Sequence, residues 1–161
     1  MVKGSFTDES FWSVEVDRLW KARIIDGYNL LPKLLPDFIS NAEIIEGDGG
    51  IGTVKKLNFT KDINGNGFVI DKIMALDSDC YLIKDTVING GLIGPRLISY
   101  SFEHKFEKIS DHSTLVKLTV EYESSDEHPL SVEEQNQLIV RMTGIMKAIE
   151  GYLHTHPTAY V

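Results

Sequence analysis

A carboxylate and an imidazole stand among apolar residues in two stretches of strand-like composition. Asp85 follows Ile83 by two positions, and His104 follows Phe102 by two. Because successive strand side chains point to opposite faces, each polar group shares a face with an apolar one. An unpaired buried carboxylate is costly, and perturbed carboxylates gather at functional sites. Asp85, Tyr100 and His104 are therefore candidates for orienting a ligand, and Asp85 in particular for general-base catalysis.

The polar residues also have a structural interpretation. Asp85 would then be hydrogen-bonded to Lys72 or to water near the mouth of a cavity, and His104 would only pack. His154 and His156 supply two imidazoles without a third ligand. Zinc sites use three or four protein ligands, so the sequence predicts no metal and no cofactor.

A glycine-rich stretch separates two strand patterns. It contains Gly47, Gly49, Gly50 and Gly52. A phosphate-binding loop would lead into a helix and end in Gly-Lys-Ser/Thr, whereas here Thr-Val-Lys and a strand pattern follow. We therefore expect a rigid hairpin turn that uses glycine's backbone freedom, with Lys55 as a solvated charge at its rim.

Composition narrows the class of protein. A length of 161 residues suits one domain, and the net charge of −8 argues against binding the phosphate backbone of nucleic acid. The single cysteine fits a reducing compartment. The polar N-terminus does not resemble a signal peptide, and no apolar run reaches the roughly 18 residues that a membrane span needs. We expect a cytoplasmic protein with no membrane span.

The hydrophobic pattern predicts one strand, two short helices and six further strands. Gly27 is expected to end the first helix, Pro32 to lie in the first turn of the second, and Asn64-Gly65-Asn66-Gly67 to form a hairpin turn. The predicted strands are Ser5–Val16, Ile39–Glu46, Thr53–Lys61, Phe68–Ala75, Cys80–Ile88, Leu97–Glu107 and Thr114–Glu123, and the predicted short helices are Asp17–Asp26 and Leu30–Leu35.

One long helix, from about Ser131 to His154, completes the pattern. Ser131 and Glu134 have the spacing of a capping box. Leu138, Met142 and Ile145 recur at spacings of three and four, which gives one apolar stripe. A long helix covering one face of an antiparallel sheet makes an α+β domain, here a single domain over 1–161.

Several segments then resemble, in collinear order, the class 10 pathogenesis-related proteins, the family of the birch major pollen allergen. The similar segments are Ile44–Lys55, Ile25–Leu30, Val87–Gly91, Glu150–Leu153 and Pro157–Tyr160. The resemblance implies a helix-grip fold, in which a seven-stranded curved antiparallel sheet wraps around the C-terminal helix and two short helices form a V. It also implies an internal hydrophobic cavity for flavonoids, cytokinins, steroids or related metabolites.

The resemblance places the Asp85 face of its strand inside this cavity. A mostly apolar pocket with a few polar groups, of roughly 300–1,000 Å³, is typical of small-molecule sites. The expected lining is Ile24, Leu31, Leu57, Phe59, Phe68, Tyr81, Ile83, Asp85, Tyr100, Phe102, His104, Val116, Leu118, Leu138, Met142 and Ile145.

The first functional hypothesis is a cytoplasmic, monomeric binder of small apolar or amphipathic plant metabolites or hormones, related to defence or stress. The alternative is an enzyme of plant specialised metabolism (isomerase, cyclase or condensing enzyme) that uses Asp85, Tyr100 or His104. The related norcoclaurine synthases use an inward lysine with acidic partners. Here Ile83 holds the lysine's place, Asp71 keeps a carboxylate, and Lys84 has the wrong parity.

Two further activities of relatives fit less well. Ribonuclease activity in the family has been tied to a loop lysine, a strand glutamate and a C-terminal Glu/Tyr pair. Lys55, Glu150 and Tyr152 are present, but Ile98 stands in place of the glutamate. Abscisic-acid receptors use a Ser-Gly-Leu-Pro-Ala gate, whereas the corresponding loop here is Gly90–Pro95. Both differences argue against those functions.

Overall fold

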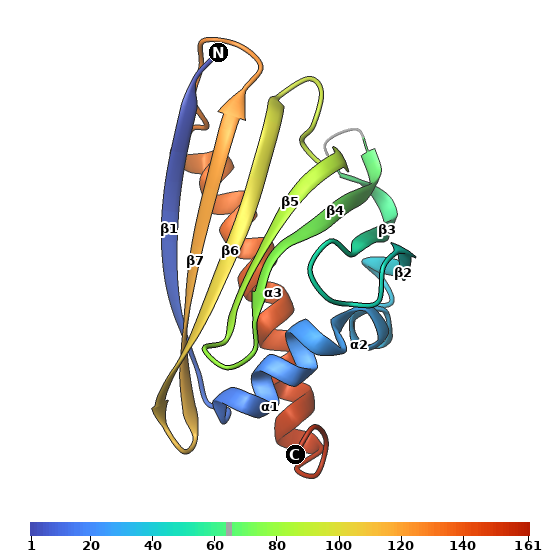
Figure 1. The fold of residues 1–161 in the computed structure, drawn as a ribbon, viewed down its shortest axis with the longest axis vertical. Helices are drawn as coiled ribbons and strands as arrows, with labels where there is room; N and C mark the ends of the chain where they lie inside the picture. Colours follow the sequence, from blue (N-terminus) through green and yellow to red (C-terminus); the bar gives the residue numbers. More distant parts are fainter. Residues whose placement is uncertain (64–65) are drawn as a thin grey trace.

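The computed structural model describes residues 1–63 and 66–161, so Asn64 and Gly65 of the predicted hairpin turn lie outside the described residues. Within them, seven strands form one antiparallel sheet in the order β1-β7-β6-β5-β4-β3-β2. Figure 1 shows this sheet curving around the long helix α3, with two short helices at one end, which confirms the predicted α+β helix-grip fold. The elements of the sheet and α3 are β1 (Lys3–Trp12), β2 (Ile39–Glu46), β3 (Val54–Ile63), β4 (Asn66–Asp77), β5 (Leu82–Gly90), β6 (Leu97–Ser110), β7 (Ser113–Ser124) and α3 (Val132–Thr155).

The first strand is shorter than the sequence predicted, because a helix cap interrupts it. β1 ends at Trp12, whereas the prediction continued to Val16. The Glu15 carboxylate accepts hydrogen bonds from the backbone amides of Asp17 and Arg18, each at 3.0 Å. A side chain that satisfies the free amides of a first turn fixes the start of a helix, so the chain turns here.

The two short helices also divide differently from the prediction. Helix α1 (Val16–Trp20) continues directly into a π-helical turn, η1 (Lys21–Ile25), and α2 spans Gly27–Leu34. Gly27 does not end the first helix but begins α2. The helical conformation is interrupted one residue earlier, at Asp26, whose φ is −112°. Pro32 therefore lies inside α2 rather than in its first turn. π-helical turns are rare and often occur at functional sites.

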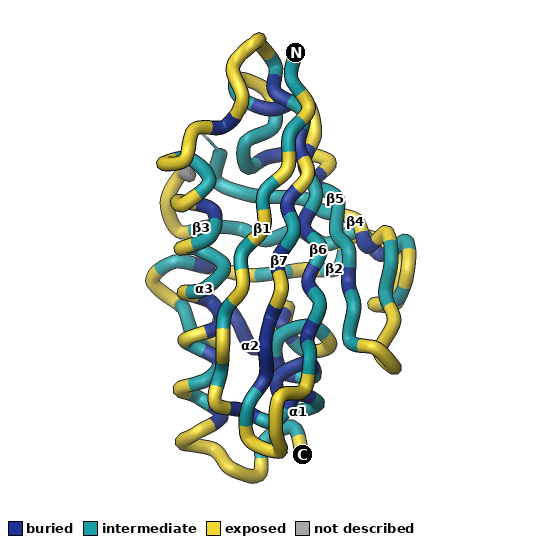
Figure 2. The backbone as a smooth tube through the Cα atoms, turned by 90° about the vertical axis from the view of Figure 1, so that its left-hand side faces the viewer, coloured by how far each residue is buried: buried dark blue, intermediate teal, exposed yellow. Residues whose placement is uncertain are grey.

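Buried side chains form two clusters on the concave side of the sheet. The Trp20 cluster contains Trp20, Phe106 and the last turns of α3, and the Trp20 and Phe106 rings meet edge-on at 5.3 Å between centroids. The Tyr100 cluster contains Tyr100, Phe102 and Leu138 of α3. Figure 2 shows that buried and exposed positions alternate along the strands, as expected for a sheet with one covered face.

An arginine fixes the start of α3. Arg96 donates to both carboxylate oxygens of Glu134, at 2.7 and 3.0 Å, and to the carbonyl oxygens of His128 and Pro129. Glu134 and Ser131 form the predicted capping box. These hydrogen bonds lower the pKa of Glu134 to about 2. Arg96 precedes β6, so this contact joins the helix start to the sheet.

A second arginine fixes the end of α3. Arg18 of α1 donates to the carbonyl oxygens of Leu153, His156 and Ala159 at 3.0–3.2 Å. Helix α3 is therefore tied to the rest of the fold at both ends.

No helix in the described part of the chain has the length and apolar character needed to span a bilayer.

We expect Arg96→Met to lower the free energy of unfolding by about 1–3 kcal/mol, because it removes charge-assisted hydrogen bonds to Glu134. Since the folded pKa of Glu134 lies below its ordinary value, its contribution is present near neutral pH and is lost as the pH falls from about 4.5 to about 2. Urea unfolding at pH 7 and pH 3 measures both effects.

The control is Lys108→Met, which removes an exposed ion pair with Asp111. Exposed pairs contribute little, so this change should cost under about 1 kcal/mol. Equal destabilisation by the two substitutions would contradict the anchoring role of Arg96.

Candidate functional site

The candidate site is a cavity of about 150 Å³ between the sheet, η1, α2 and α3. This volume is below the roughly 300–1,000 Å³ that the sequence led us to expect. Of the predicted lining residues, the wall contains Ile24, Leu31, Leu57, Ile83, Asp85, Phe102, His104, Met142 and Ile145. The other residues of the wall are Arg23, Gly27, Tyr28, Ala42, Lys55, Lys56, Val69, Asp71 and Val87.

Three predicted aromatic lining residues lie elsewhere. Tyr81 precedes β5 in a turn with φ of 58° and packs in the Trp20 cluster. Phe59 stacks on Phe38 with 5.2 Å between ring centroids. Phe68 alternates to the face of β4 opposite Val69, and the Nζ atom of Lys56 lies 5.0 Å from its ring centroid.

Four further predicted lining residues fill the core instead. Val116 belongs to the Trp20 cluster, whereas Leu118, Leu138 and Tyr100 belong to the Tyr100 cluster. The Tyr100 hydroxyl accepts a hydrogen bond from the Leu92 amide at 3.1 Å and so holds the β5–β6 loop. These side chains therefore pack in the core and are not part of the cavity wall.

Five charged residues line the cavity. They are Arg23 from η1, Lys55 and Lys56 from β3, Asp71 from β4 and Asp85 from β5. Lys55 pairs directly opposite Asp71 across β3 and β4, and its Nζ atom lies 3.6 Å from Oδ1 of Asp85. This distance makes an ion pair but is too long for a hydrogen bond. Three basic and two acidic residues therefore contribute to one cavity wall, and the Nζ atom of Lys56 lies over the Phe68 ring.

Three buried polar atoms of the same wall have no hydrogen-bond partner among the described residues. They are Nε of Arg23, Oδ1 of Asp85 and Nδ1 of His104. The His104 residue is only 4% exposed. Buried polar atoms are usually paired, and each exception needs an explanation. Their common position on one cavity makes a bound polar group a direct explanation.

Burial shifts the protonation of this wall. It raises the pKa of Asp71 to about 6, opposed by the nearby charge of Lys55, and it also raises the pKa of Asp85. Burial and the positive charges of Arg23 and Lys55 lower the pKa of His104 to about 3. The imidazole is therefore neutral at physiological pH, and the two carboxyl groups can take up a proton more readily than exposed ones.

Sequence reasoning missed Arg23 and misplaced Lys55. Arg23 follows the buried Leu19 by four positions, so helical spacing already put it on the inner side of the first helix. Lys55 was expected as a solvated rim charge, but it lines the cavity because β3 pairs in a register that places it opposite Asp71. Lys55 has the same parity as Leu57, which was predicted to line the cavity, so strand alternation could have placed Lys55 on the inner face.

The glycine-rich loop uses its own amides internally. Gly47, Gly49 and Gly52 have φ values of 99°, 100° and 89°, in the left-handed region that favours glycine. The Gly49 amide donates to Oγ1 of Thr53 at 2.9 Å, and the Gly50 amide donates to Oδ1 of Asp48 at 3.0 Å. These amides are therefore occupied by the protein itself rather than directed at a phosphate group.

The residues linked to ribonuclease activity have separate partners. Glu150 accepts a hydrogen bond from the Ser13 amide at 2.8 Å, and Tyr152 stacks on His156 at 4.2 Å between ring centroids. Lys55 instead faces Asp85 in the cavity. The structure therefore gives no shared arrangement of these side chains.

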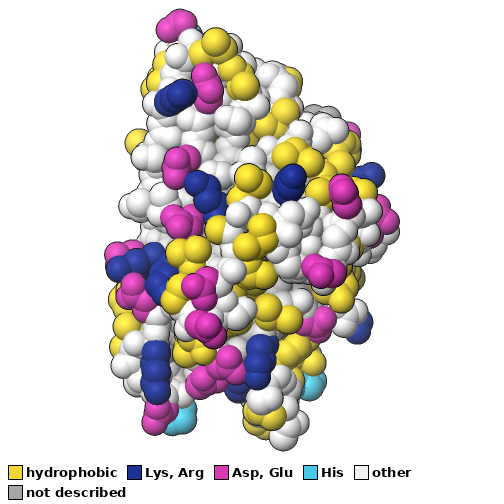
Figure 3. Space-filling view, viewed as in Figure 1, with side chains coloured by type: hydrophobic (Ala, Val, Ile, Leu, Met, Phe, Trp, Pro, Cys, Tyr) yellow, Lys and Arg dark blue, Asp and Glu magenta, His cyan; other side chains and the backbone are white. Residues whose placement is uncertain are grey.

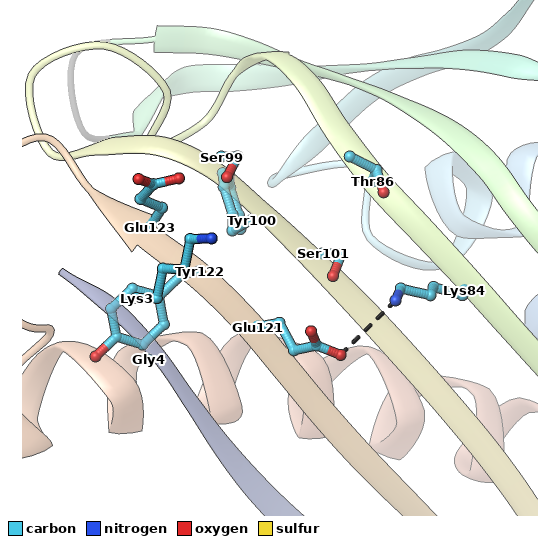
Figure 4. Close-up of a pocket in the computed structure, with 10 residues that line it drawn as sticks. All are labelled: Lys3, Gly4, Lys84, Thr86, Ser99, Tyr100, Ser101, Glu121, Tyr122 and Glu123. Carbon is cyan, nitrogen blue, oxygen red and sulfur yellow. Dashed lines mark ion pairs between the residues drawn. The ribbon is translucent and has the colours of Figure 1, made fainter. Parts of the chain in front are cut away.

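A second hollow, of about 380 Å³, lies on the outer face of the sheet. Figure 4 shows its polar side chains on neighbouring strands, with Lys84 of β5 directed at Glu121 of β7 across 3.7 Å. Lys84 thus faces away from the cavity, as its parity predicted. Among the described residues, this lining contains no buried unpartnered polar atom.

The molecular surface mixes both signs of charge. On the face drawn in Figure 3, basic, acidic and hydrophobic side chains are interspersed. The whole chain has 24 acidic and 16 basic residues. The geometry favours the inner cavity as the candidate site, because its wall contains the three buried polar atoms without partners among the described residues.

A curved sheet that grips a terminal helix around an internal cavity defines the class of helix-grip proteins. The chain belongs to the Pathogenesis-related protein Bet v 1 family, whose family model matches residues 1–156.

Relatives with similar sequences are pathogenesis-related proteins and allergens. The chain is 33% identical to Pathogenesis-related protein 1 of Asparagus officinalis over 161 residues, which cover 100% of both chains. It is 35% identical to the major allergen Pru av 1 of Prunus avium over 159 residues, with 98% and 99% of the two chains covered.

Solved structures agree with this assignment. The crystal structure of Ara h 8.0201 superposes with a TM-score of 0.83 at 35% identity, covering 96% of this chain and 99% of the other. Norcoclaurine synthase from Thalictrum flavum, in complex with dopamine and hydroxybenzaldehyde, superposes with a TM-score of 0.76 at 25% identity and covers 96% and 88% of the two chains.

We expect the His104 imidazole to stay neutral between pH 8 and pH 5, because its pKa is lowered to about 3. Its NMR signals should not shift over this range in the folded protein, whereas the urea-unfolded protein should titrate near the ordinary value of about 6.5. Since the unfolded chain takes up this proton first, stability should fall as the pH drops from about 6.5 to about 3. A His104 titration near pH 6.5 in the folded protein would mean that the site is hydrated.

Proposed function

We propose that this chain is a cytoplasmic plant protein that binds a small apolar or amphipathic metabolite or hormone in its inner cavity, in a defence or stress response. The observation that carries the proposal is the cavity of about 150 Å³ itself, where apolar walls surround unpartnered polar atoms. Small-molecule sites are usually built in this way, with a few polar groups that orient the ligand.

The apolar part of the wall supplies the affinity in this proposal. Leu31 and Ile83 are 5% and 2% exposed, and both face the cavity together with Leu57 and Ile145. Removing apolar ligand surface from water is favourable by roughly 25 cal/mol per Å². The polar groups would add orientation, because a ligand that leaves Asp85 or Arg23 unpaired binds less well.

The relatives support this proposal at the level of the family. Several are called pathogenesis-related proteins or allergens, and the norcoclaurine synthase structure holds two small aromatic molecules. A shared fold does not by itself assign an activity, since function depends on the residues of the site. The wall of this cavity therefore carries the argument.

We expect apolar plant metabolites of one to four rings, titrated into labelled protein, to cause saturable NMR shifts at residues of the inner wall such as Leu57 and Ile83. Asp85→Asn should weaken binding of the best ligand about tenfold, since a hydrogen bond to a charged group contributes roughly 1.5–3 kcal/mol. The matched control is Glu121→Gln on the outer face, which should leave affinity unchanged.

Two results would contradict the proposal. One is that no compound of the panel shifts the inner wall. The other is that shifts are confined to the outer hollow around Lys84 and Glu121.

A second candidate function is catalysis in the same cavity. The amine of Lys55 lies beside the Asp85 carboxylate and opposite Asp71, and burial raises the pKa of both carboxyl groups. An amine and carboxyl groups with shifted pKa values can exchange protons with a bound substrate. The arrangement favours Lys55, Asp71 and Asp85 for this role over Tyr100, whose hydroxyl holds a loop.

Mass spectrometry of the compounds after incubation tests this alternative. For a binder, every ligand is recovered unaltered. For an enzyme, conversion should be lost in Lys55→Met and kept in Lys84→Met, because Lys84 lies on the outer face. Conversion that survives Lys55→Met would exclude Lys55 from the chemistry.

A further inference from the structure

We propose that Arg23, Asp85 and His104 form a polar subsite that binds the neutral hydroxyl group of a ligand about the size of one ring. The inference rests on the proposed binding function and specifies which ligand chemistry the cavity selects. It follows from the size of the cavity, the hydrogen-bonding capacity of its unpartnered atoms and the balance of its charges.

The volume limits the body of the ligand. An apolar protein cavity of about 150 Å³ accommodates benzene, and the present cavity has about the same volume. Ile24, Leu57 and Ile83 provide an apolar wall for such a ring. Larger ligands usually occupy roughly 300–1,000 Å³, which this cavity does not offer without rearrangement.

The unpartnered atoms define the polar group of the ligand. Nε of Arg23 carries a hydrogen and can only donate, whereas the ionised Asp85 Oδ1 can only accept. Nδ1 of the neutral His104 ring can do either, depending on its tautomer. A hydroxyl group donates one hydrogen bond and accepts others, so it satisfies both kinds of partner at once. A purely apolar ligand would leave all three atoms unpaired.

The register of the sheet places two of these groups close to each other. Asp85 pairs opposite Phe102 across β5 and β6, and His104 pairs opposite Ile83. Asp85 and His104 are therefore diagonal neighbours on the inner face, at a spacing of roughly 7–8 Å. Arg23 enters the same cavity from η1. One small group between them can therefore contact more than one partner.

The charge balance of the wall favours a neutral group. The positive charges of Arg23 and Lys55 match the negative charges of Asp71 and Asp85 when all four are ionised. The fifth charged residue of the wall, Lys56, directs its amine at the Phe68 ring, with Nζ 5.0 Å from the ring centroid. A carboxylate or an ammonium group on the ligand would add an uncompensated charge to a buried site, and burying a charge is costly unless it is paired. A hydroxyl group leaves the balance unchanged.

Four compounds with the same ring test the inference. Toluene, benzyl alcohol, benzoate and benzylamine differ mainly in one substituent, which is apolar, hydroxyl, anionic or cationic. We expect benzyl alcohol to bind at least about tenfold more tightly than the other three at pH 7, measured by protein NMR titration of the full chain. 2-Naphthalenemethanol, which adds a second ring, should bind more weakly than benzyl alcohol.

Variants identify the residues responsible. Arg23→Met and Asp85→Asn should each reduce the preference for benzyl alcohol over toluene by about tenfold while leaving the affinity for toluene unchanged. Toluene thus reports whether the cavity of each variant is intact. Glu121→Gln on the outer face should leave all affinities unchanged. If Arg23→Met loses toluene binding through collapse, Asp85→Asn alone decides the result.

Each contrary outcome overturns a defined part of the inference. Tighter binding of benzoate or benzylamine overturns the neutral hydroxyl, and tighter binding of the naphthalene compound overturns the size limit. A hydroxyl preference that survives Asp85→Asn overturns the subsite. Failure of every compound, including the metabolite panel, to shift the inner wall defeats the proposed binding function itself, so the two failures are distinguishable.

Discussion

The rest of this structure depends on how α3 is held against the concave face of the sheet. An antiparallel sheet with one apolar face must cover that face, and a single helix covers it here. Arg96 holds the start of the helix through Glu134, and Arg18 holds its end through backbone carbonyl groups. Because both ends are held, α3 leaves part of the concave face of the sheet uncovered. The space left beside β3, β4 and β5 is the cavity.

The cavity departs from an ordinary hydrophobic core in its polar content. Buried charges are costly unless they are paired, and here Lys55 compensates Asp85 at 3.6 Å without a hydrogen bond. The same burial keeps His104 neutral and raises the pKa of Asp71 to about 6. Apolar residues would fill such a space more stably. Polar groups that lack partners at this position are better explained by recognition of a ligand than by stability.

Membership in the Bet v 1 family fixes the architecture and leaves the chemistry to the wall. Relatives with this fold include allergens and a norcoclaurine synthase, so the fold alone is compatible with more than one activity. In this chain a few side chains shape the candidate site. Tyr100 and Leu118 fill the core, and Arg23 and Lys55 bring charge to the cavity. Their arrangement is the basis of the ligand class that we propose.

Several features could be predicted from the amino-acid sequence: the order of the elements, the capping box at Ser131, and the strand alternation that puts Asp85 and Lys84 on opposite faces. The resemblance to the family indicated which of these faces points inward. These features follow from local rules: strand alternation, helical spacing and cap residues. Packing in the folded chain decided that the Lys55 amine lies beside Asp85 and that the Tyr100 hydroxyl holds the β5–β6 loop. Those positions depend on strand register and on packing between segments far apart in the chain. Local patterns do not encode either, because each is the result of many side chains filling one shared volume.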